Sequence, residues 1–190
     1  MRKIAFFDFD GTLYKKDSTI TFCLYCYKKK PFLMWFLCIQ TLYLCLHKLK
    51  LVSIEVFKEK FFGFLNYIAE DTINKLLEGF WDKEINKSMN NDIVGHLQRL
   101  KKNGAEIFII SASPEFLLEK PKEKLGAHIL LGTKMNVKPK VKIKGKNCRG
   151  IEKKVRLEEY INTAYCIIEG YSDNYDDDHL LSISERSVKL

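Results

Sequence analysis

The sequence lacks the features of membrane-spanning, repetitive and multi-domain chains. Its longest apolar run, residues 32–46, falls short of the roughly 20 apolar residues that a spanning helix needs. No internal repeat and no linker rich in glycine, serine or proline interrupts the 190 residues. This length suits one domain with a sizeable core, or a core that carries an inserted subdomain.

The N-terminal region also lacks the pattern of an export signal. Met1-Arg2-Lys3 precedes only a short apolar segment before Asp8, too short for the apolar part of a signal peptide. We therefore expect a cytoplasmic protein whose six cysteines stay reduced. Cys23 and Cys26 form a C-x-x-C pair, but no second pair and no suitably spaced histidines accompany it. Buried apolar thiols are thus favoured over a metal or redox site.

Basic residues outnumber acidic residues, 32 to 24, and give a net charge of +8. This balance favours anionic partners, such as phosphorylated metabolites, lipid headgroups or nucleic acid, without choosing among them. Lysines recur with period two along 137–146, so on a strand they would share one face. We favour a solvated face on an edge strand, with an anion-attracting flap as the alternative. No aromatic residue lies between these lysines, and we expect no nucleic acid partner.

Apolar runs and turn residues predict the order of strands and helices. Four buried strands are expected, and Ser187–Leu190 suggests a further short edge strand; the buried strands are 3–8, 106–110, 128–131 and 166–169. Residues 17–102 and 150–162 read as helical, with helix starts at Asp17-Ser18 and Asn90-Asn91-Asp92 and a stop at Gly104. Ser113 is expected to cap another helix that begins with Pro114.

Strands that alternate with helices argue for an α/β fold with a parallel sheet and right-handed crossovers. The helical block between the first two strands is too long for a simple crossover. We therefore expect a helical cap, 15–102, inserted into a core that is built from 1–14 and 103–190.

The run 32–46 is apolar almost all round and has lysines on both sides, at 28–30 and at 48 and 50. A helix buried inside the cap is the favoured interpretation, because apolar runs of this size usually form core. The alternative is a helix that touches an anionic bilayer, with 28–50 as a peripheral membrane contact. That alternative would place the protein at the inner face of a membrane.

The first strand ends in two carboxylates, Asp8 and Asp10, within Asp8-Phe9-Asp10-Gly11-Thr12-Leu13. In open α/β sheets, ligands bind at the carboxyl ends of the strands. Two like charges held this close are costly unless a cation or a shared proton relieves them. Mg²⁺, a hard ion that prefers carboxylate oxygens, is the expected cation.

Three later segments add polar groups at comparable places. Ser111 ends the second strand, where a hydroxyl and the free amides of the next helix suit a phosphoryl oxygen. The last long helix carries Lys153 and Lys154 in its first turn, and one of them can reach inward and neutralise a phosphoryl group. Acidic residues follow the last buried strand, at Asp173 and 176–178, and complete an oxygen-ligand site for Mg²⁺.

These segments resemble the four motifs of the haloacid dehalogenase (HAD) superfamily over almost the whole chain. The matching stretches are Asp8-x-Asp10-Gly11-Thr12, Ser111, Gly150-x-x-Lys153 and Tyr171-Ser172-Asp173-Asn174-x-x-Asp177. Ser172 and Asn174 replace the glycine and serine that are usual in the last motif. The resemblance implies a Rossmann-like core, with a parallel sheet flanked by helices, and an inserted helical type-one cap. Within the superfamily it is nearest to subfamily IB and the phosphatidylglycerophosphatase C and phosphoserine phosphatase-like group.

The resemblance also implies a reaction, the Mg²⁺-dependent hydrolysis of a phosphomonoester. Asp8 would be the nucleophile that forms an aspartyl-phosphate, and Asp10 the general acid and base. Four groups are implied as magnesium ligands: Asp8, the backbone carbonyl of Asp10, Asp173 and Asp177. Three groups are implied to hold the phosphoryl oxygens: Ser111, the amide of Ala112 and Lys153.

The cap bears on the choice of ester. No arginine lies between Arg2 and Arg99, whereas phosphoserine phosphatases of this superfamily clamp the substrate carboxylate with a cap arginine that lysine replaces poorly. The run 32–46 and its flanking lysines instead favour a lipid phosphate, such as phosphatidylglycerophosphate, over a soluble phosphoserine-like or sugar phosphate. A non-catalytic protein that binds anionic surfaces is a further alternative, disfavoured by the complete set of motif residues.

Overall fold

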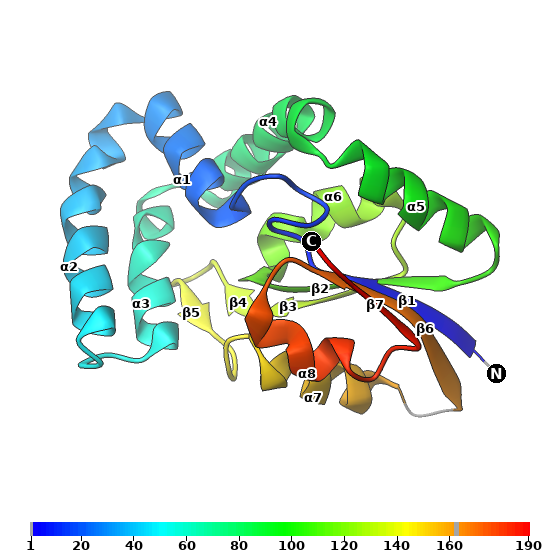
Figure 1. The fold of residues 1–190 in the computed structure, drawn as a ribbon. Coiled ribbons are helices and arrows are strands. Elements are labelled where there is room, and N and C mark those ends of the chain that lie inside the picture. The colour runs from blue at the N-terminus through cyan, green and yellow to red at the C-terminus, as the bar shows by residue number, and fades with distance from the viewer. Residues whose placement is uncertain (1, 162–163) are drawn as a thin grey trace.

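The computed structural model describes residues 2–161 and 164–190 (Figure 1). At its centre lies a parallel sheet of five strands: β1 (Arg2–Phe7), β2 (Glu106–Pro114), β3 (Ile129–Thr133), β6 (Tyr165–Ser172) and β7 (Arg186–Lys189). The strand order is β3-β2-β1-β6-β7. The four predicted buried strands and the short edge strand are therefore confirmed, as is the Rossmann-like α/β class.

Helices cover both faces of the sheet (Figure 1). The helices of the core are α5 (Asn91–Lys102), α6 (Glu115–Leu125), α7 (Ile151–Tyr160) and α8 (Asp178–Leu181), with the short η3 (Tyr175–Asp177) before α8. Side chains of β1 alternate between two cores, since Ala5 and Phe7 pack into one cluster and Ile4 and Phe6 into the other. Residue 162, the end of the predicted helix 150–162, lies outside the described residues.

Between β1 and α5 the chain forms a helical block. Its elements are α1 (Ser18–Lys29), η1 (Pro31–Trp35), α2 (Phe36–Lys48), α3 (Ile54–Phe61), η2 (Gly63–Tyr67) and α4 (Glu70–Ser88). Asp17 caps α1 as expected, because its carboxylate accepts a 2.8 Å hydrogen bond from the Ile20 amide. In Figure 1, α1, α2 and α3 lie beyond the carboxyl ends of the strands. The cap limits 15–102 stay a prediction.

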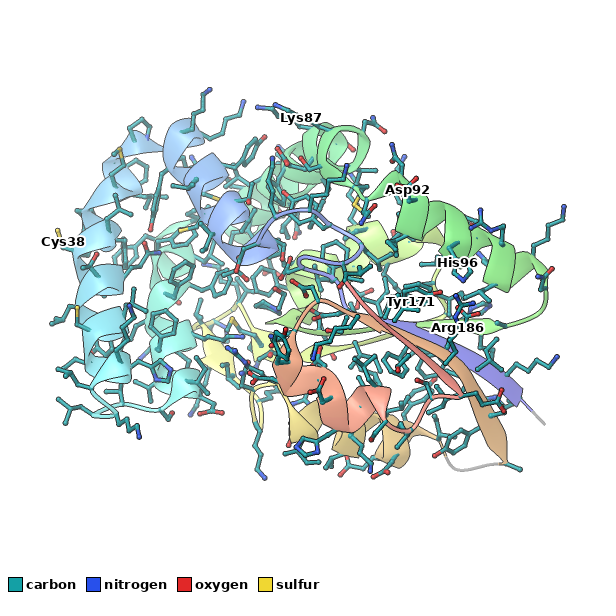
Figure 2. All side chains as sticks on the ribbon, in the orientation of Figure 1. Cys38, Lys87, Asp92, His96, Tyr171 and Arg186 are labelled. Carbon is teal, nitrogen blue, oxygen red and sulfur yellow. The ribbon has the colours of Figure 1, made fainter. Side chains whose placement is uncertain are left out.

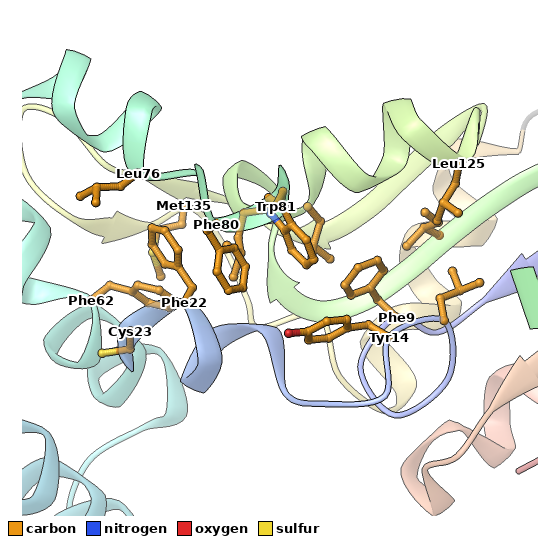
Figure 3. Close-up of a cluster of buried hydrophobic side chains, with 14 of the residues drawn as sticks. Phe9, Tyr14, Phe22, Cys23, Phe62, Leu76, Phe80, Trp81, Leu125 and Met135 are labelled. Carbon is orange, nitrogen blue, oxygen red and sulfur yellow. The ribbon is translucent and has the colours of Figure 1, made fainter. Parts of the chain in front are cut away.

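An aromatic cluster joins the first loop to the helical block (Figure 3). Phe9 and Tyr14 both meet the ring of Trp81 edge-on, with ring centroids 5.6 and 5.4 Å apart. The Trp81 indole N–H donates a 2.6 Å hydrogen bond to the Leu117 carbonyl of α6. Phe9 is fully buried in this core and anchors the loop. The carboxylates of Asp8 and Asp10, on either side of Phe9, are therefore free to face away from this core.

The expectation that 32–46 is buried inside the cap is wrong for most of its residues. Only Leu33, Phe36 and Gln40 are buried, whereas Trp35 and Leu42 are 51% and 55% exposed. Figure 2 shows Cys38 on the side of α2 that faces away from the rest of the molecule. The run therefore packs along one narrow stripe, and no other element among residues 2–161 and 164–190 covers its outer side. Among the described residues, no helix combines the length and apolar character needed to cross a membrane.

Two local predictions need correction. Ser113 does not cap α6, because β2 continues through Pro114 and Pro114 itself occupies the N-cap position. The segment 137–146 is not an edge strand of the main sheet. Only Lys142–Ile143 of it is extended, as β5, and this strand pairs antiparallel with β4 (Met135–Asn136). The hairpin instead packs on α3, where the Ile143 amide donates a 2.9 Å hydrogen bond to Glu59.

The lysine alternation within that segment is real from residue 140 onward. Lys140, Lys142, Lys144 and Lys146 are all exposed, whereas the alternating Val141 and Ile143 are buried. All six cysteines of the chain are free, and Cys23 and Cys26 are buried in α1, in agreement with their interpretation as apolar thiols.

Candidate active site

Parallel register brings the polar strand ends together. Phe7 pairs with Ile109 of β2 and with Tyr171 of β6, so Asp8 is the first residue beyond the paired part of β1. The Asp8 amide still donates a 2.9 Å hydrogen bond to the Tyr171 carbonyl, which fixes its position between the neighbouring strands. The strand ends open into a cavity of about 680 Å³ whose lining includes Asp8, Asp10, Lys58, Ser111, Lys153 and Asp173.

Asp8 lies at the floor of this cavity and is almost completely buried. One carboxylate oxygen accepts a 2.7 Å hydrogen bond from the Phe9 amide, and the other lies 3.0 Å from the Lys153 ammonium. Burial raises the pKa of Asp8 to about 7, with the Asp177 charge adding to the rise and Lys153 opposing it. The Lys153 ammonium thus favours the ionised form of this poorly solvated carboxylate, which is the form that can attack an electrophile.

Lys153, and not Lys154, reaches into the site. Its side chain is 2% exposed, and its ammonium lies 2.6 Å from Asp177 as well as 3.0 Å from Asp8. Burial by itself would lower the pKa of Lys153, but the two carboxylates outweigh it and raise the pKa above its ordinary value. Lys154 points along the helix surface toward Glu158, 3.8 Å away.

Asp10 lies next to Asp8 but has different partners. The Ser113 hydroxyl donates a 2.5 Å hydrogen bond to it, and the amide of Ser18, in the first turn of α1, donates another of 2.8 Å. Burial raises the pKa of Asp10 to about 6, against the hydrogen bonds from Ser113 and Ser18 that lower it. A carboxyl group with this pKa can hold and release a proton near neutral pH, which suits a general acid and base.

Gly11 allows Asp173 to approach the loop between β1 and α1. Gly11 has a φ of +77°, and a Cβ at this position would lie 1.9 Å from a carboxylate oxygen of Asp173. Any side chain here would therefore displace the Asp173 carboxylate as well as strain the backbone. The glycine after Asp10 thus brings the loop after β6 against the loop after β1.

The carboxylates of this region suit a hard cation. Ser172 and Lys153 both contact one oxygen of Asp177, each at 2.6 Å, while the other oxygen, Oδ1, is buried without a hydrogen-bond partner. An orphaned buried carboxylate oxygen is costly unless a cation or water takes it. The donor set of Asp8, Asp173 and Asp177 therefore fits Mg²⁺, although no group of three or more acidic, histidine or cysteine side chains already converges into a metal cluster within residues 2–161 and 164–190.

Ser111 and Ala112 lie in the last part of β2, beside the carboxylates. The Ser111 hydroxyl is buried and accepts a 3.1 Å hydrogen bond from the Ser113 amide, so its own proton is free to be donated. The structure thus brings Asp8, Asp10, Ser111, Ala112, Lys153 and Asp173 to one cavity, with Asp177 directly behind it. No predicted site residue lies elsewhere.

Lys58 is a cavity residue that the sequence analysis missed. It extends from α3, and its ammonium donates hydrogen bonds of 2.7 Å to the Ala112 carbonyl and 2.6 Å to the Asn147 amide oxygen. Burial lowers the pKa of Lys58 to about 8, against the attraction of Asp10 and Asp17. Nothing in the local sequence separates Lys58 from the exposed Lys60 two positions later. Only the docking of α3 on the core distinguishes them.

Comparison with known proteins places this site in context. Protein CicA of Caulobacter vibrioides is 30% identical over 98 residues, which are 50% of this chain and 44% of CicA, so the match spans less than half the length of that relative. A protein of unknown function from Bordetella pertussis Tohama I superposes with a TM-score of 0.86 at 19% identity, over 100% of this chain and 90% of the other. A structure described as a phospho-aspartyl intermediate analogue of phosphoserine phosphatase reaches a TM-score of 0.59 at 16% identity, over 99% and 86% of the two chains.

At such low identities the structural matches show a shared fold. The decisive comparison is with a family model of haloacid dehalogenase-like hydrolases, which matches residues 5–182. This match covers most of the chain and includes every cavity residue described above. The protein is therefore a member of the haloacid dehalogenase-like hydrolase family.

Proposed function

We propose that the protein is a magnesium-dependent phosphomonoester hydrolase that works through an aspartyl-phosphate. The observation that carries this proposal is the pairing of two buried carboxylates with unlike surroundings at the end of β1. Asp8 lies 3.0 Å from the Lys153 ammonium, whereas Asp10 accepts hydrogen bonds from the neutral Ser113 hydroxyl and Ser18 amide. Unlike environments of this kind separate a nucleophile from an acid and base.

The proposed reaction has two steps. An Asp8 oxygen forms a bond to phosphorus while the bond between phosphorus and the ester oxygen breaks, and Asp10 gives its proton to that leaving oxygen. Asp10 then accepts a proton from a water molecule, whose oxygen attacks phosphorus and displaces the Asp8 carboxylate. Inorganic phosphate leaves, and both aspartates return to their starting forms.

The surrounding groups hold the phosphoryl oxygens in line. We assign this role to the Ser111 hydroxyl, the Ala112 amide and the Lys153 ammonium, which all lie at the cavity floor. Mg²⁺ would be held by Asp8, the backbone carbonyl of Asp10, Asp173 and Asp177. When bound, it would offset the repulsion between an anionic nucleophile and an anionic ester and bear charge that develops in the transition state.

A substrate panel tests the reaction. Phosphate release is measured with and without Mg²⁺ from p-nitrophenyl phosphate, phosphoserine and phosphatidylglycerophosphate. We expect Mg²⁺-dependent release from at least one ester and a loss of about a thousandfold or more in Asp8→Asn. Asp92→Asn is the matched control, because Asp92 is exposed in the first turn of α5, away from the cavity. Equal rates for Asp8→Asn and the wild type would refute the assignment of Asp8 as the nucleophile. No release by the wild type from any of the three esters would favour a non-catalytic binding protein.

Within the family, we propose membership of subfamily IB near the phosphatidylglycerophosphatase C group, and a lipid phosphate as the ester. The supporting observation is the exposed outer side of η1 and α2, where Phe32, Trp35 and Leu42 are uncovered beside the exposed Lys28 and Lys48. Apolar side chains with flanking lysines suit the boundary of an anionic bilayer. We therefore propose that 28–50 contacts the inner face of a membrane.

Co-sedimentation with vesicles tests this contact apart from the reaction. Binding is expected with vesicles that contain phosphatidylglycerol and is expected to weaken with pure phosphatidylcholine. Trp35→Ser combined with Leu42→Ser should reduce the bound fraction, since both side chains are about half exposed and support little of the core. Equal binding of both vesicle types, or none, would contradict the contact and return a soluble phosphorylated metabolite as the favoured substrate.

A further inference from the structure

The catalytic cavity continues into an apolar groove between α1, α2 and α3. Four residues line both: Ile20 of α1, Leu44 of α2, and Phe57 and Phe61 of α3. Beyond them the groove adds a further 220 Å³. The two spaces therefore adjoin at these four side chains, and together they extend from the carboxylates at the sheet edge to the outside of the helical block.

The lining side chains change from ionisable in the cavity to apolar in the groove. At the inner end lie the ionisable side chains of Asp8, Lys58 and Lys153 in a confined space. At the outer end the walls are mostly apolar, and they include Leu24 and Leu37, which are 58% and 39% exposed. A small polar leaving group would leave these walls in water, whereas a molecule with a phosphate at one end and a hydrocarbon chain at the other would match both ends.

The groove is held open by a buried amide at its base. Gln40 of α2 donates hydrogen bonds of 2.8 Å to the Phe61 carbonyl of α3 and 3.1 Å to the Cys23 sulfur of α1. The Gln40 side-chain nitrogen is thus hydrogen-bonded to both neighbouring helices. This cross-link fixes the spacing of the helices, so the groove is preformed.

We propose that this groove binds the hydrocarbon chain of a phosphate ester whose phosphate lies against Asp8 and Lys153. The proposal rests on the proposed phosphomonoester hydrolysis and adds the binding site for the leaving group. Ile20, Leu44, Phe57 and Phe61 contact the first part of the chain, and Leu24 and Leu37 contact its end. The same site accepts a free alkyl phosphate or a lipid phosphate in a bilayer, because the groove contacts only the hydrocarbon chain.

Binding to the Asp8→Asn protein tests the groove whether or not the wild type turns over. Calorimetry with Mg²⁺ present compares ethyl, butyl, hexyl and octyl phosphate. We expect Kd to fall about fourfold for each methylene that the groove buries, until the chain reaches the open end. In the same background, Leu24→Gln combined with Leu37→Gln should lower the octyl-to-ethyl affinity ratio at least tenfold. Leu51→Gln is the matched control, because Leu51 is 68% exposed and lies outside the groove.

Each outcome of this experiment supports or overturns the proposed binding site. Equal affinity for ethyl and octyl phosphate, or an unchanged octyl-to-ethyl affinity ratio in the double variant, overturns it. An unchanged ratio together with a dimer that the double variant breaks identifies a contact between copies of the chain, which also overturns it. Chain-dependent binding without any wild-type hydrolysis supports the groove and refutes the proposed reaction. Hydrolysis of monomeric octyl phosphate, compared with phosphatidic acid in phosphatidylcholine vesicles, then distinguishes a free ester from a membrane lipid, and either result supports the groove.

Discussion

Replacing Gly11 by alanine would place a methyl group where the Asp173 carboxylate now lies. The new Cβ would be 1.9 Å from the nearer Asp173 oxygen, whereas ordinary contact begins near 3.4 Å, so the carboxylate must retreat by about 1.5 Å. Mg²⁺ demands ligand distances of about 2.0–2.1 Å, and a ligand displaced this far no longer coordinates. The exposed Asp173 can turn away freely, so most of the cost in stability comes from the positive φ, about 1–2 kcal/mol.

Gly104→Ala supplies the matched control. Gly104 has a φ of +84°, close to that of Gly11, but a Cβ there meets no atom within 4 Å. Both variants should lose a similar free energy of unfolding in urea. Only Gly11→Ala should raise the Mg²⁺ concentration at half-maximal phosphate release, by about tenfold or more, as expected when the surroundings of a metal are disturbed. A wild-type Mg²⁺ dependence in Gly11→Ala, or an equal rise in both variants, would refute the assignment of Asp173 as a metal ligand.

Two further replacements test buried charges. Lys153→Met leaves Asp8 and Asp177 without their shared cation and should cost about 3–5 kcal/mol of unfolding free energy in urea. Replacing the partly exposed Lys154 in the same way should change the unfolding free energy by less than about 0.5 kcal/mol. A similar loss in both would contradict the placement of Lys153. Burial raises the pKa of Glu84, but its hydrogen-bond partners outweigh burial and lower it below 4.5. The ionised form thus contributes stability above pH 4.5 that is lost as the pH falls below that value, so Glu84→Gln should lie about 1–2 kcal/mol below the wild type at pH 7 and approach it near pH 3 in thermal unfolding. If the difference in stability between Glu84→Gln and the wild type did not change with pH, an ionised Glu84 would be contradicted.

Local patterns predicted the sheet well because each buried strand leaves a short apolar run in the sequence. The run before Asp8 and the run before Ser111 became β1 and β2 at nearly the expected places. Predictions of secondary structure were wrong where a local pattern is compatible with two structures. Ser113 and Pro114 have the form of a helix start, yet Ser113 stays in β2 and uses its hydroxyl to bind Asp10. That hydrogen bond joins residues far apart in the chain, so no local pattern could reveal it.

Burial of an apolar helix cannot be predicted from its composition alone. The run 32–46 contains enough apolar residues for a core helix, but Phe36 and Gln40 are the only buried residues of α2. How much of a helix is covered depends on what packs against it. The helix α2 packs against α3 and η1, its Phe36 meets Phe64 and Tyr67 of η2, and its Gln40 contacts Cys23 of α1. The same dependence explains why Lys58 was missed, since its reach into the cavity follows from the docking of α3.

The sequence by itself determined which chemical groups stand at the ends of the strands, because strand ends and turns are encoded by neighbouring residues. The alternation of strands and helices and the resemblance to known motifs then led to the α/β class and to the candidates Asp8, Asp10, Ser111, Lys153 and Asp173. The tertiary structure decided how these groups interact. It placed Lys153 between two carboxylates, gave Asp8 and Asp10 unlike surroundings, and opened the cavity into an apolar groove. Distances, burial and pKa values arise from contacts between distant segments, and those contacts exist only in the folded chain.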